Sequence, residues 1–317
     1  MLKEYAVEPA AMGSSWENFR YLIELLTFER GRRISRFPKR WERQVIDAAA
    51  ASGFGEVKLA SVVDRLQSAK SHGSLVPSGR SFDPALEWLQ NALAQHAQKP
   101  FSGIIAQANP TNENAVLLAA DVDDGHALIQ STHSLEVPRT GPDLANAIAP
   151  LVCSAKEILI IDPYIDWRNV GPAQGYRAFL TEILSRLTAS GSVVRTIQMH
   201  YRTHNSRPPQ EVPGTNAGQR LGGLLPQGYH LELFEWQQRQ NGEDFHDRHI
   251  ICDCGGLSIG AGFDAVGAHQ NARITLEPFN ITQRLRARFE PRTAAFDLVG
   301  KILVIAADGS VRERGPR

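Results

Sequence analysis

Three residues with reactive or charged side chains lie close together between positions 246 and 253. His246 and Arg248 are two residues apart, and Asp253 follows five residues later. An imidazole nitrogen can attack phosphorus, while a neighbouring guanidinium neutralises the non-bridging oxygens of the phosphate. The spacing therefore predicts a site for a phosphodiester.

The residues around this motif are typical of strands, whose side chains alternate between two faces. On a strand, His246 and Arg248 would share a face and Asp253 would lie on the other. Positions 257, 259, 261 and 263 are apolar, which places Asp264 on the polar face. A further strand over residues 273–277 would put Glu277 on its polar face.

The motif resembles the His-x-Lys-x4-Asp sequence of the phospholipase D superfamily, with Arg248 at the position of the family's lysine. In that family the aspartate is followed by six residues and then by Gly-Ser-x-Asn. Here six residues lead to Gly260, Ala261 stands at the serine position and Phe263 at the asparagine position. Asp264 comes next and is the better candidate for the polar residue of the site.

The resemblance implies a role for each residue. His246 would attack phosphorus to form a covalent phosphohistidine, and Arg248 would stabilise the developing charge. Glu277 would orient the imidazole, as a carboxylate does in the family's single-motif nucleases, and Asp253 would be mainly structural. Asp264 would be a polar residue of the site. The resemblance implies no metal ion and no cofactor.

Family chemistry uses two histidines, one to attack and one to protonate the leaving oxygen. A second His-x-Arg occurs at His200, but position 207, where an aspartate would be needed, is Arg207. We therefore expect the second histidine to come from another chain. This predicts a homodimer with two His246 side chains in a shared active site.

A second candidate site is a basic segment at residues 30–43. Seven of its fourteen residues are Lys or Arg, with Phe37 and Trp41 between them. Basic side chains contact phosphates and aromatic rings stack on bases, so the segment predicts binding of DNA or RNA. The residues expected to contact the nucleic acid are Arg32, Arg33, Arg36, Lys39 and Arg40, with Arg273 from the other half of the chain. The alternative is a basic helix face whose aromatic residues pack inward and whose charges pair with Glu29 and Glu42.

Composition limits the class of protein. A chain of 317 residues with 42% hydrophobic and 21% charged residues predicts about two globular domains. The formal net charge is zero, so any attraction for nucleic acid must be local. The three cysteines form no disulfide framework and Cys252 and Cys254 have no second pair for zinc, which favours a reducing, cytoplasmic location. The N-terminal residues do not have the pattern of a signal peptide, and no apolar run reaches the roughly 20 residues needed to span a bilayer. A membrane location is therefore not expected.

The C-terminal half, residues 143–317, has the pattern of an α/β sandwich with a mixed sheet. We expect strands over 157–162, 192–199 and 230–236, a helix over 176–187 and a shorter one ending near Leu225. This is also the element order of one phospholipase D half-domain, including a strand that ends in Asp-Pro-Tyr. Asp162, Tyr164 and Asp166 follow that strand and are expected to support the site. Arg284, Arg286 and Arg288 alternate and could form a surface strand or a phosphate-contacting row.

The N-terminal half, residues 1–140, predicts a mixed α+β domain of unknown type. Helices are expected over 15–28, capped by Ser15, and from Asp83 onwards. Short strands are expected over 101–107, 115–121 and 127–137. The Pro- and Gly-containing stretch 138–142 is the expected linker.

Together these features predict a metal-independent phosphodiesterase, best interpreted as a nuclease that cleaves DNA or RNA. A role in bacterial defence is compatible with the family. One alternative is a catalytically inactive module that binds nucleic acid. Another is a phosphodiesterase acting on a lipid or small molecule, although no amphipathic membrane-binding segment supports a lipid.

Overall fold

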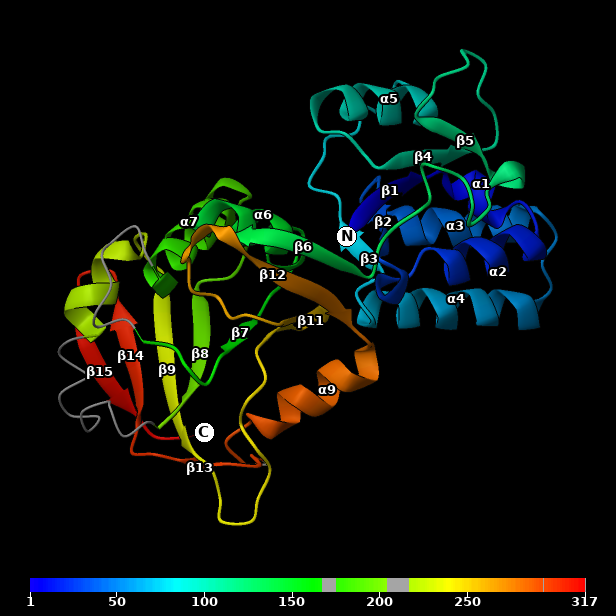
Figure 1. Cartoon of the computed structure of the whole chain (residues 1–317). Coiled ribbons are helices and arrows are strands. Elements are labelled where there is room, and N and C mark those ends of the chain that lie inside the picture. The colour runs from blue at the N-terminus through cyan, green and yellow to red at the C-terminus, as the bar shows by residue number, and fades with distance from the viewer. Residues whose placement is uncertain (167–174, 204–216, 293, 317) are drawn as a thin grey trace. The chain divides into compact units, whose positions relative to one another are not determined.

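The computed structural model describes residues 1–166, 175–203, 217–292 and 294–316 (Figure 1). The chain divides into two compact units, Met1–His133 and Ser134–Arg317. Each unit is built on its own β-sheet with helices packed against it, so the predicted α/β class is confirmed.

The N-terminal unit contains a five-stranded sheet in the order β3-β2-β1-β4-β5. Its strands are β1 (Lys3–Val7), β2 (Arg32–Arg36), β3 (Leu75–Pro77), β4 (Gly103–Ala106) and β5 (Val116–Leu118). All four pairings are parallel. Parallel strands need crossover connections, which helices provide here, so the unit is an α/β layer structure and not the expected α+β mixture.

Helices cover both faces of this sheet (Figure 1). One core cluster joins strand residues to α1 (Pro9–Gly13), α2 (Trp16–Leu25), α3 (Trp41–Ala51) and α4 (Glu56–Ser71). The other cluster joins the opposite face to α5 (Trp88–Gln98). Single 3-10 turns, η1 (Phe28–Arg30) and η2 (Ala119–Asp121), complete the unit.

Several N-terminal elements differ in extent from the prediction. The helix expected over 15–28 is α2, and the Ser15 hydroxyl accepts the Asn18 N–H at 3.1 Å as its cap. The helix expected from Asp83 begins only at Trp88, because Asn91 folds back and bonds both the N–H and the carbonyl of Asp83. The strands expected over 101–107 and 115–121 are shorter, and residues 127–133 form no strand.

The C-terminal unit contains a larger sheet, in the order β15-β14-β9-β8-β7-β10-β11-β12-β6, with β13 paired to β9. Its strands are β6 (Ser134–Arg139), β7 (Ile158–Ile161), β8 (Thr196–Arg202), β9 (His230–Gln237), β10 (His249–Cys252), β11 (Gly255–Ile259), β12 (Gly267–Glu277), β13 (Asp297–Leu298), β14 (Ile302–Ala306) and β15 (Val311–Arg314). β7, β8 and β9 are parallel and the other pairings are antiparallel. The predicted mixed sheet is therefore confirmed.

Three longer helices pack on this sheet. α6 (Gly141–Val152) and α7 (Gly175–Ala189) pack against each other, and α9 (Phe279–Arg288) packs on β10 and β11. Figure 1 shows the α6–α7 pair and α9 on opposite sides of the sheet. The 3-10 turn η3 (Gly222–Leu224) replaces the end of the short helix expected near Leu225. No helix in the described part of the chain is both long and apolar enough to span a bilayer.

Two C-terminal expectations are wrong. The expected linker over 138–142 contains the end of β6 and the start of α6, with Thr140 as N-cap, so the boundary falls at His133–Ser134. Pro138 is tolerated because β6 is the last strand of the sheet order. On an edge strand, a residue without an N–H need not remove a hydrogen bond between strands. The alternating Arg284, Arg286 and Arg288 lie on α9, so they form neither a strand nor a single row.

Candidate functional site

One edge of the C-terminal sheet collects the polar residues that follow its strands. Ile161 at the end of β7 pairs with His200 on β8 and with His249 at the start of β10. The carboxyl ends of β7, β8 and β9 therefore meet the amino end of β10. In α/β sheets, ligands bind outside such carboxyl ends. The residues that lie beyond this edge include Asp162, Tyr164, His246 and Arg248, and Arg202 is the last residue of β8.

His246 and Arg248 precede β10 and are not on it, contrary to expectation. β10 begins at His249, opposite the last residue of β7. The chain after β7 turns at Pro163, and the Arg248 carbonyl still accepts the Ile259 N–H of β11 at 2.9 Å. On the β7 side, Arg248 and His246 contact the side chains of Asp162 and Tyr164.

Arg248 is held by three groups. Its Nε lies 3.6 Å from Asp162 Oδ1, and its Nη1 donates to the Gly260 carbonyl at 3.2 Å. The guanidinium carbon lies 4.8 Å from the centroid of the Tyr164 ring, within the range of a cation–π interaction. A planar guanidinium fixed in this way is suited to bind the oxygens of a phosphate.

Asp162 is fully buried beneath this arginine. Its carboxylate accepts the Tyr164 N–H at 2.9 Å and the Tyr176 hydroxyl at 2.8 Å. Burial raises the pKa of Asp162, while these hydrogen bonds and Arg248 oppose the rise. Burial and the neighbouring carboxylate also raise the pKa of Tyr176, which therefore stays a hydrogen-bond donor. Asp162 is thus a positioning group for Arg248.

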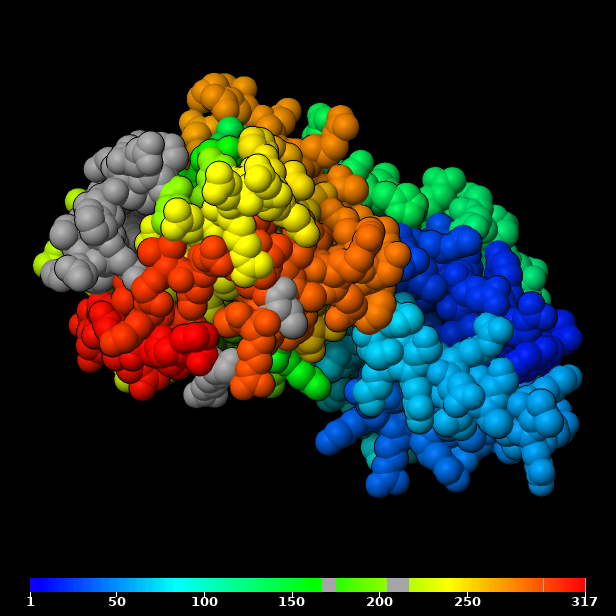
Figure 2. Space-filling view, turned by 90° about the horizontal axis from the view of Figure 1, so that it is seen from below, coloured from blue at the N-terminus to red at the C-terminus, as the bar shows by residue number. Residues whose placement is uncertain are grey.

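His246 is exposed, and its ring meets the Tyr164 ring edge-on, with centroids 5.8 Å apart. The guanidinium carbon of Arg202 lies 5.5 Å from the same Tyr164 centroid. The segment before β10, yellow in Figure 2, lies at the surface of its unit. One tyrosine therefore brings an accessible imidazole and two guanidinium groups together.

Asp264 also reaches this region, beside Gly262. A Cβ on Gly262 would lie 3.1 Å from Asp162 Oδ2 and from Asp264 Oδ1, and 3.2 Å from Arg248 Nε. The residue has φ +90°, so glycine is required both by conformation and by space. Asp264 forms an ion pair with Arg139 at the end of β6. Arg139 therefore offsets the charge of Asp264.

Glu277 does not orient His246, as the family role implied. Its Oε1 lies 3.7 Å from Nδ1 of a different histidine, His249, on β10. His249 is buried and burial lowers its pKa to about 4, so it is neutral near pH 7. The expectation was wrong because it counted distance along the sequence, whereas strand register places Glu277 beside β10 and not beyond its end.

Asp253 lies at the other end of β10, away from the candidate site. Its Oδ1 accepts the backbone N–H groups of Lys156 at 2.7 Å and Glu157 at 3.3 Å. These bonds tie the turn after β10 to the start of β7. This geometry is that of a structural residue.

His200 is part of the core. Trp236 Nε1 donates to its Nδ1 at 3.1 Å, and its ring stacks on Phe234 with centroids 4.4 Å apart. Burial lowers the pKa of His200 to about 3. A permanently neutral, enclosed imidazole cannot serve as the second histidine of the reaction. His204 and Arg207 lie outside the described residues.

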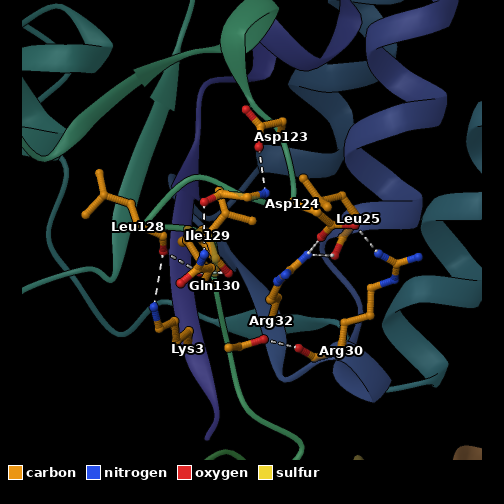
Figure 3. A network of polar contacts seen from close by, with 12 residues as sticks. Lys3, Leu25, Arg30, Arg32, Asp123, Asp124, Leu128, Ile129 and Gln130 are labelled. Carbon is orange, nitrogen blue, oxygen red and sulfur yellow. Dashed lines mark hydrogen bonds and ion pairs between the residues drawn. The ribbon is translucent and has the colours of Figure 1, made fainter.

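Only part of the basic segment of the N-terminal unit is internal, since Arg30, Lys39, Arg40 and Arg43 are exposed. Figure 3 shows Arg30 and Arg32, which both pair with Asp124. Residues 32–36 form β2, inside the parallel sheet, and the side chains of Arg32 and Arg33 are buried. Arg32 forms an ion pair with Asp124 and also donates to the Leu25 carbonyl at 3.5 Å. Arg30 pairs with Asp124 too, at 2.8 Å. These arginines hold the loop around Asp124 against the strand.

The rest of the segment confirms the alternative interpretation for its aromatic residues. Phe37 and Trp41 are fully buried, and Arg36 Nε pairs with Glu42 at 2.8 Å. Lys39 and Arg40 are exposed at the start of α3. In the C-terminal unit, Arg273 is paired with Glu136 at 2.8 Å on the surface. Within the N-terminal unit, the five expected nucleic-acid contacts do not form one exposed row, because Arg32 and Arg33 are buried and Arg36 is paired.

Two residues of the C-terminal site escaped sequence reasoning. Arg139 was assigned to the linker and Tyr176 to the hydrophobic stripe of a helix. A tyrosine in a helical stripe gives no signal that its hydroxyl bonds a buried carboxylate. Arg202 was placed at a strand end that could line the substrate groove, and it is the last residue of β8, which is parallel to β7.

Comparison with known proteins adds little. No protein-family model matches the chain, and no curated protein matches it. Among solved structures, it is similar to TrmBL2, an archaeal chromatin protein described as showing a novel mode of DNA binding. The identity is 12%, the TM-score is 0.28, and the match covers 82% of this chain and 83% of the other. A similarity of that size carries no conclusion about fold or function.

Proposed function

We propose that the C-terminal unit is a phosphodiesterase of the phospholipase D type that cleaves DNA or RNA without a metal ion. The observation that carries the proposal is the grouping of the His246 imidazole and the Arg248 guanidinium around Tyr164. Both groups lie beyond the carboxyl ends of the parallel strands, where substrate has access. The three free cysteines, Cys153, Cys252 and Cys254, fit a cytoplasmic protein.

The chemistry assigned to these groups has two steps. A nitrogen of His246 attacks phosphorus and a P–O ester bond breaks, leaving a phosphohistidine and a free hydroxyl. Water then attacks the phosphohistidine, which releases the phosphate monoester and restores the imidazole. Arg248, fixed by Asp162, would neutralise charge on the non-bridging oxygens in both steps.

The departing oxygen needs a proton, and this supports a shared site. His200 is enclosed in the core, which removes the second histidine that the sequence offered as a proton donor. His246 is exposed, so a second copy of the chain could bring its own His246 opposite the first. We therefore propose a homodimer with a two-fold axis through the active site.

The test uses the full-length protein with labelled DNA, RNA and a simple alkyl phosphodiester, all in the presence of a metal chelator. We expect cleavage, and transfer of label from a 5′-labelled substrate to the protein as an acid-labile adduct. His246→Ala should lose both, with an unchanged thermal unfolding midpoint, because the residue is exposed. Cleavage by that variant at the parent rate would refute the assignment.

A second candidate function is a module that binds phosphodiesters without cleaving them. It is favoured by the position of Glu277, which lies beside His249 and leaves His246 without a carboxylate to fix its tautomer. Among the residues that the structure describes, no hydrogen bond to the His246 ring is present. This candidate predicts that binding, but no label transfer, is found in the experiment above, and that Arg248→Ala removes the binding.

A further inference from the structure

A cavity of about 1150 Å³ adjoins the candidate site inside the C-terminal unit. Arg248 and Tyr164 form part of its wall, so the cavity begins where the proposed phosphate site ends. From there it extends between the start of α6, the first two turns of α7 and the segment after β11. Its volume lies just above the range of about 300–1,000 Å³ that is usual for ligand pockets.

The walls of this cavity are chemically mixed. Part of the lining is aromatic or apolar, with the rings of Tyr164 and Tyr176 and the methyl groups of Ala178, Ala261 and Ala265. The polar part of the lining comprises Arg139, Thr140, Asp166, Thr181, Glu182 and Asp264. Such walls suit a flat group that stacks on rings while its edge exchanges hydrogen bonds with carboxylates and hydroxyls.

Charge fixes the direction in which a ligand would lie. The three carboxylates inside the cavity disfavour an anionic group there, although Arg139 pairs with Asp264 and Arg186 with Glu182. Arg248 lies at the border instead, with its own carboxylate buried beneath it. A phosphate would therefore remain at Arg248 and a neutral part of the ligand would enter the cavity.

We propose that the cavity binds a nucleoside of the substrate, joined to the phosphate that Arg248 holds. A nucleobase is neutral and flat, and carries N–H donors for carboxylate acceptors, which matches these walls. An acyl chain would displace water from Asp166 and from the Glu182–Arg186 and Asp264–Arg139 ion pairs, and taking charged groups out of water is costly. The cavity thus selects nucleic acid over lipid. The inference rests on the proposed function for the position of the phosphate at Arg248. Its test measures binding and does not require that the protein cleaves the ligand.

Thr181 on α7 offers a variant that fills the cavity without touching the reacting groups. It lines the cavity, its side chain is exposed, and its hydroxyl bonds only the Arg177 carbonyl, at 2.9 Å. Thr188 is a matched control two turns further along α7. It is exposed, its hydroxyl bonds the Leu184 carbonyl at 2.8 Å, and it does not line the cavity.

Binding of adenosine 5′-monophosphate and of ribose 5-phosphate to the full-length protein should be measured by calorimetry. We expect the parent and Thr188→Trp to bind the nucleotide about 5- to 150-fold more tightly than ribose 5-phosphate, the factor that corresponds to about 1–3 kcal/mol for one stacked base. Thr181→Trp should bind the two ligands equally. Thr181→Met, which fills less space, should fall between them and guards against misfolding of the larger variant.

The outcomes separate this inference from the proposed function. Equal binding of the two ligands by the parent, or retained discrimination in Thr181→Trp, would refute the nucleoside pocket even if the protein cleaves DNA. Discrimination by the parent and its loss in Thr181→Trp would support the pocket even if no phosphodiester is cleaved.

Discussion

Arg32 in the N-terminal unit and Arg248 in the C-terminal unit were both predicted to bind phosphate. Each forms an ion pair with an aspartate, but the buried member is the arginine in the first pair and the aspartate in the second. Arg32 is 7% exposed and its partner Asp124 is 58% exposed. Arg248 is 21% exposed and its partner Asp162 is 0% exposed. In the first pair the protein encloses the cation and a surface loop supplies the acid. In the second it encloses the acid and presents the cation to a cavity.

The reversal shows that a count of basic residues does not tell which of them a ligand can reach. Of the seven basic residues at 30–43, Arg32 and Arg33 are buried and Arg36 pairs with Glu42, whereas Arg248 lies on a buried carboxylate at the border of a cavity. The difference between Arg32 and Arg248 depends on which member of the ion pair is removed from water, because desolvating a charge costs free energy. The following predictions test the comparison, beginning with the largest effect.

Replacing each arginine by alanine should separate the two roles. Arg248→Ala should lower kcat/KM for a dinucleotide by about 10²–10³-fold, the usual loss for one transition-state donor. Arg248→Lys should recover part of it. Arg32→Ala should leave the kcat/KM of folded protein within about threefold but lower the unfolding free energy by about 1–3 kcal/mol. Loss of cleavage by a folded Arg32→Ala protein would contradict the structural role of Arg32.

Acid should destabilise the C-terminal unit through its two buried histidines. Burial lowers the pKa of His249 to about 4 and that of His200 to about 3, from an ordinary 6.5. Between these values the unfolded chain binds more protons, so the stabilisation is complete above pH 6.5 and is lost as the pH falls toward 4.

The matching measurement is the unfolding free energy against pH for the parent and His249→Gln. At about 1.4 kcal/mol per pH unit, His249 should contribute about 2 kcal/mol to the difference between pH 6.5 and pH 5. The variant should show a shallower dependence over this range. If the unfolding free energies of the parent and of His249→Gln had the same pH dependence, His249 would not be buried from water, which would contradict the structure.

Asp124→Asn should affect stability and leave nucleic-acid binding unchanged. It removes the charge opposite the buried Arg32, and an unpaired buried group costs about 1–3 kcal/mol. Arg43→Ala is a suitable control because Arg43 is exposed and pairs only with Asp47 four residues away, where the loss should be about 0.5 kcal/mol or less. Hydrogen exchange would locate the opening at residues 121–131.

Glu277→Gln should have the smallest effect on cleavage, about threefold or less. Glu277 lies beside His249 and not beside His246, so the change alters no group around Tyr164. Steady-state kinetics with a dinucleotide would measure it. A loss of a hundredfold or more would restore the family role of Glu277 and indicate that the site rearranges when substrate binds.

Local patterns were sufficient to predict most elements of the C-terminal unit. The apolar run before Asp162 is β7, and the 3.6-residue stripe from Tyr176 to Leu187 is α7. Both signals arise from burial of one face of a single element, so they can be seen in a short window. The boundary near residue 140 failed for a related reason. Pro138 and Gly141 look like breakers locally, but an edge strand and a helix start tolerate them.

The sequence by itself determined that Asp264 is a polar residue near Arg248 and that the C-terminal unit forms α/β layers with a mixed sheet. It also predicted that His246 and Arg248 lie on a strand, whereas β10 begins only at His249. Only the tertiary structure decided which groups meet. Asp124 reaches Arg32 across 92 positions, and Glu277 meets His249 because strand register, not sequence distance, sets the contact. The physical reason is that the patterns of a strand or helix reflect its own burial, whereas an ion pair depends on two distant segments that the fold brings together.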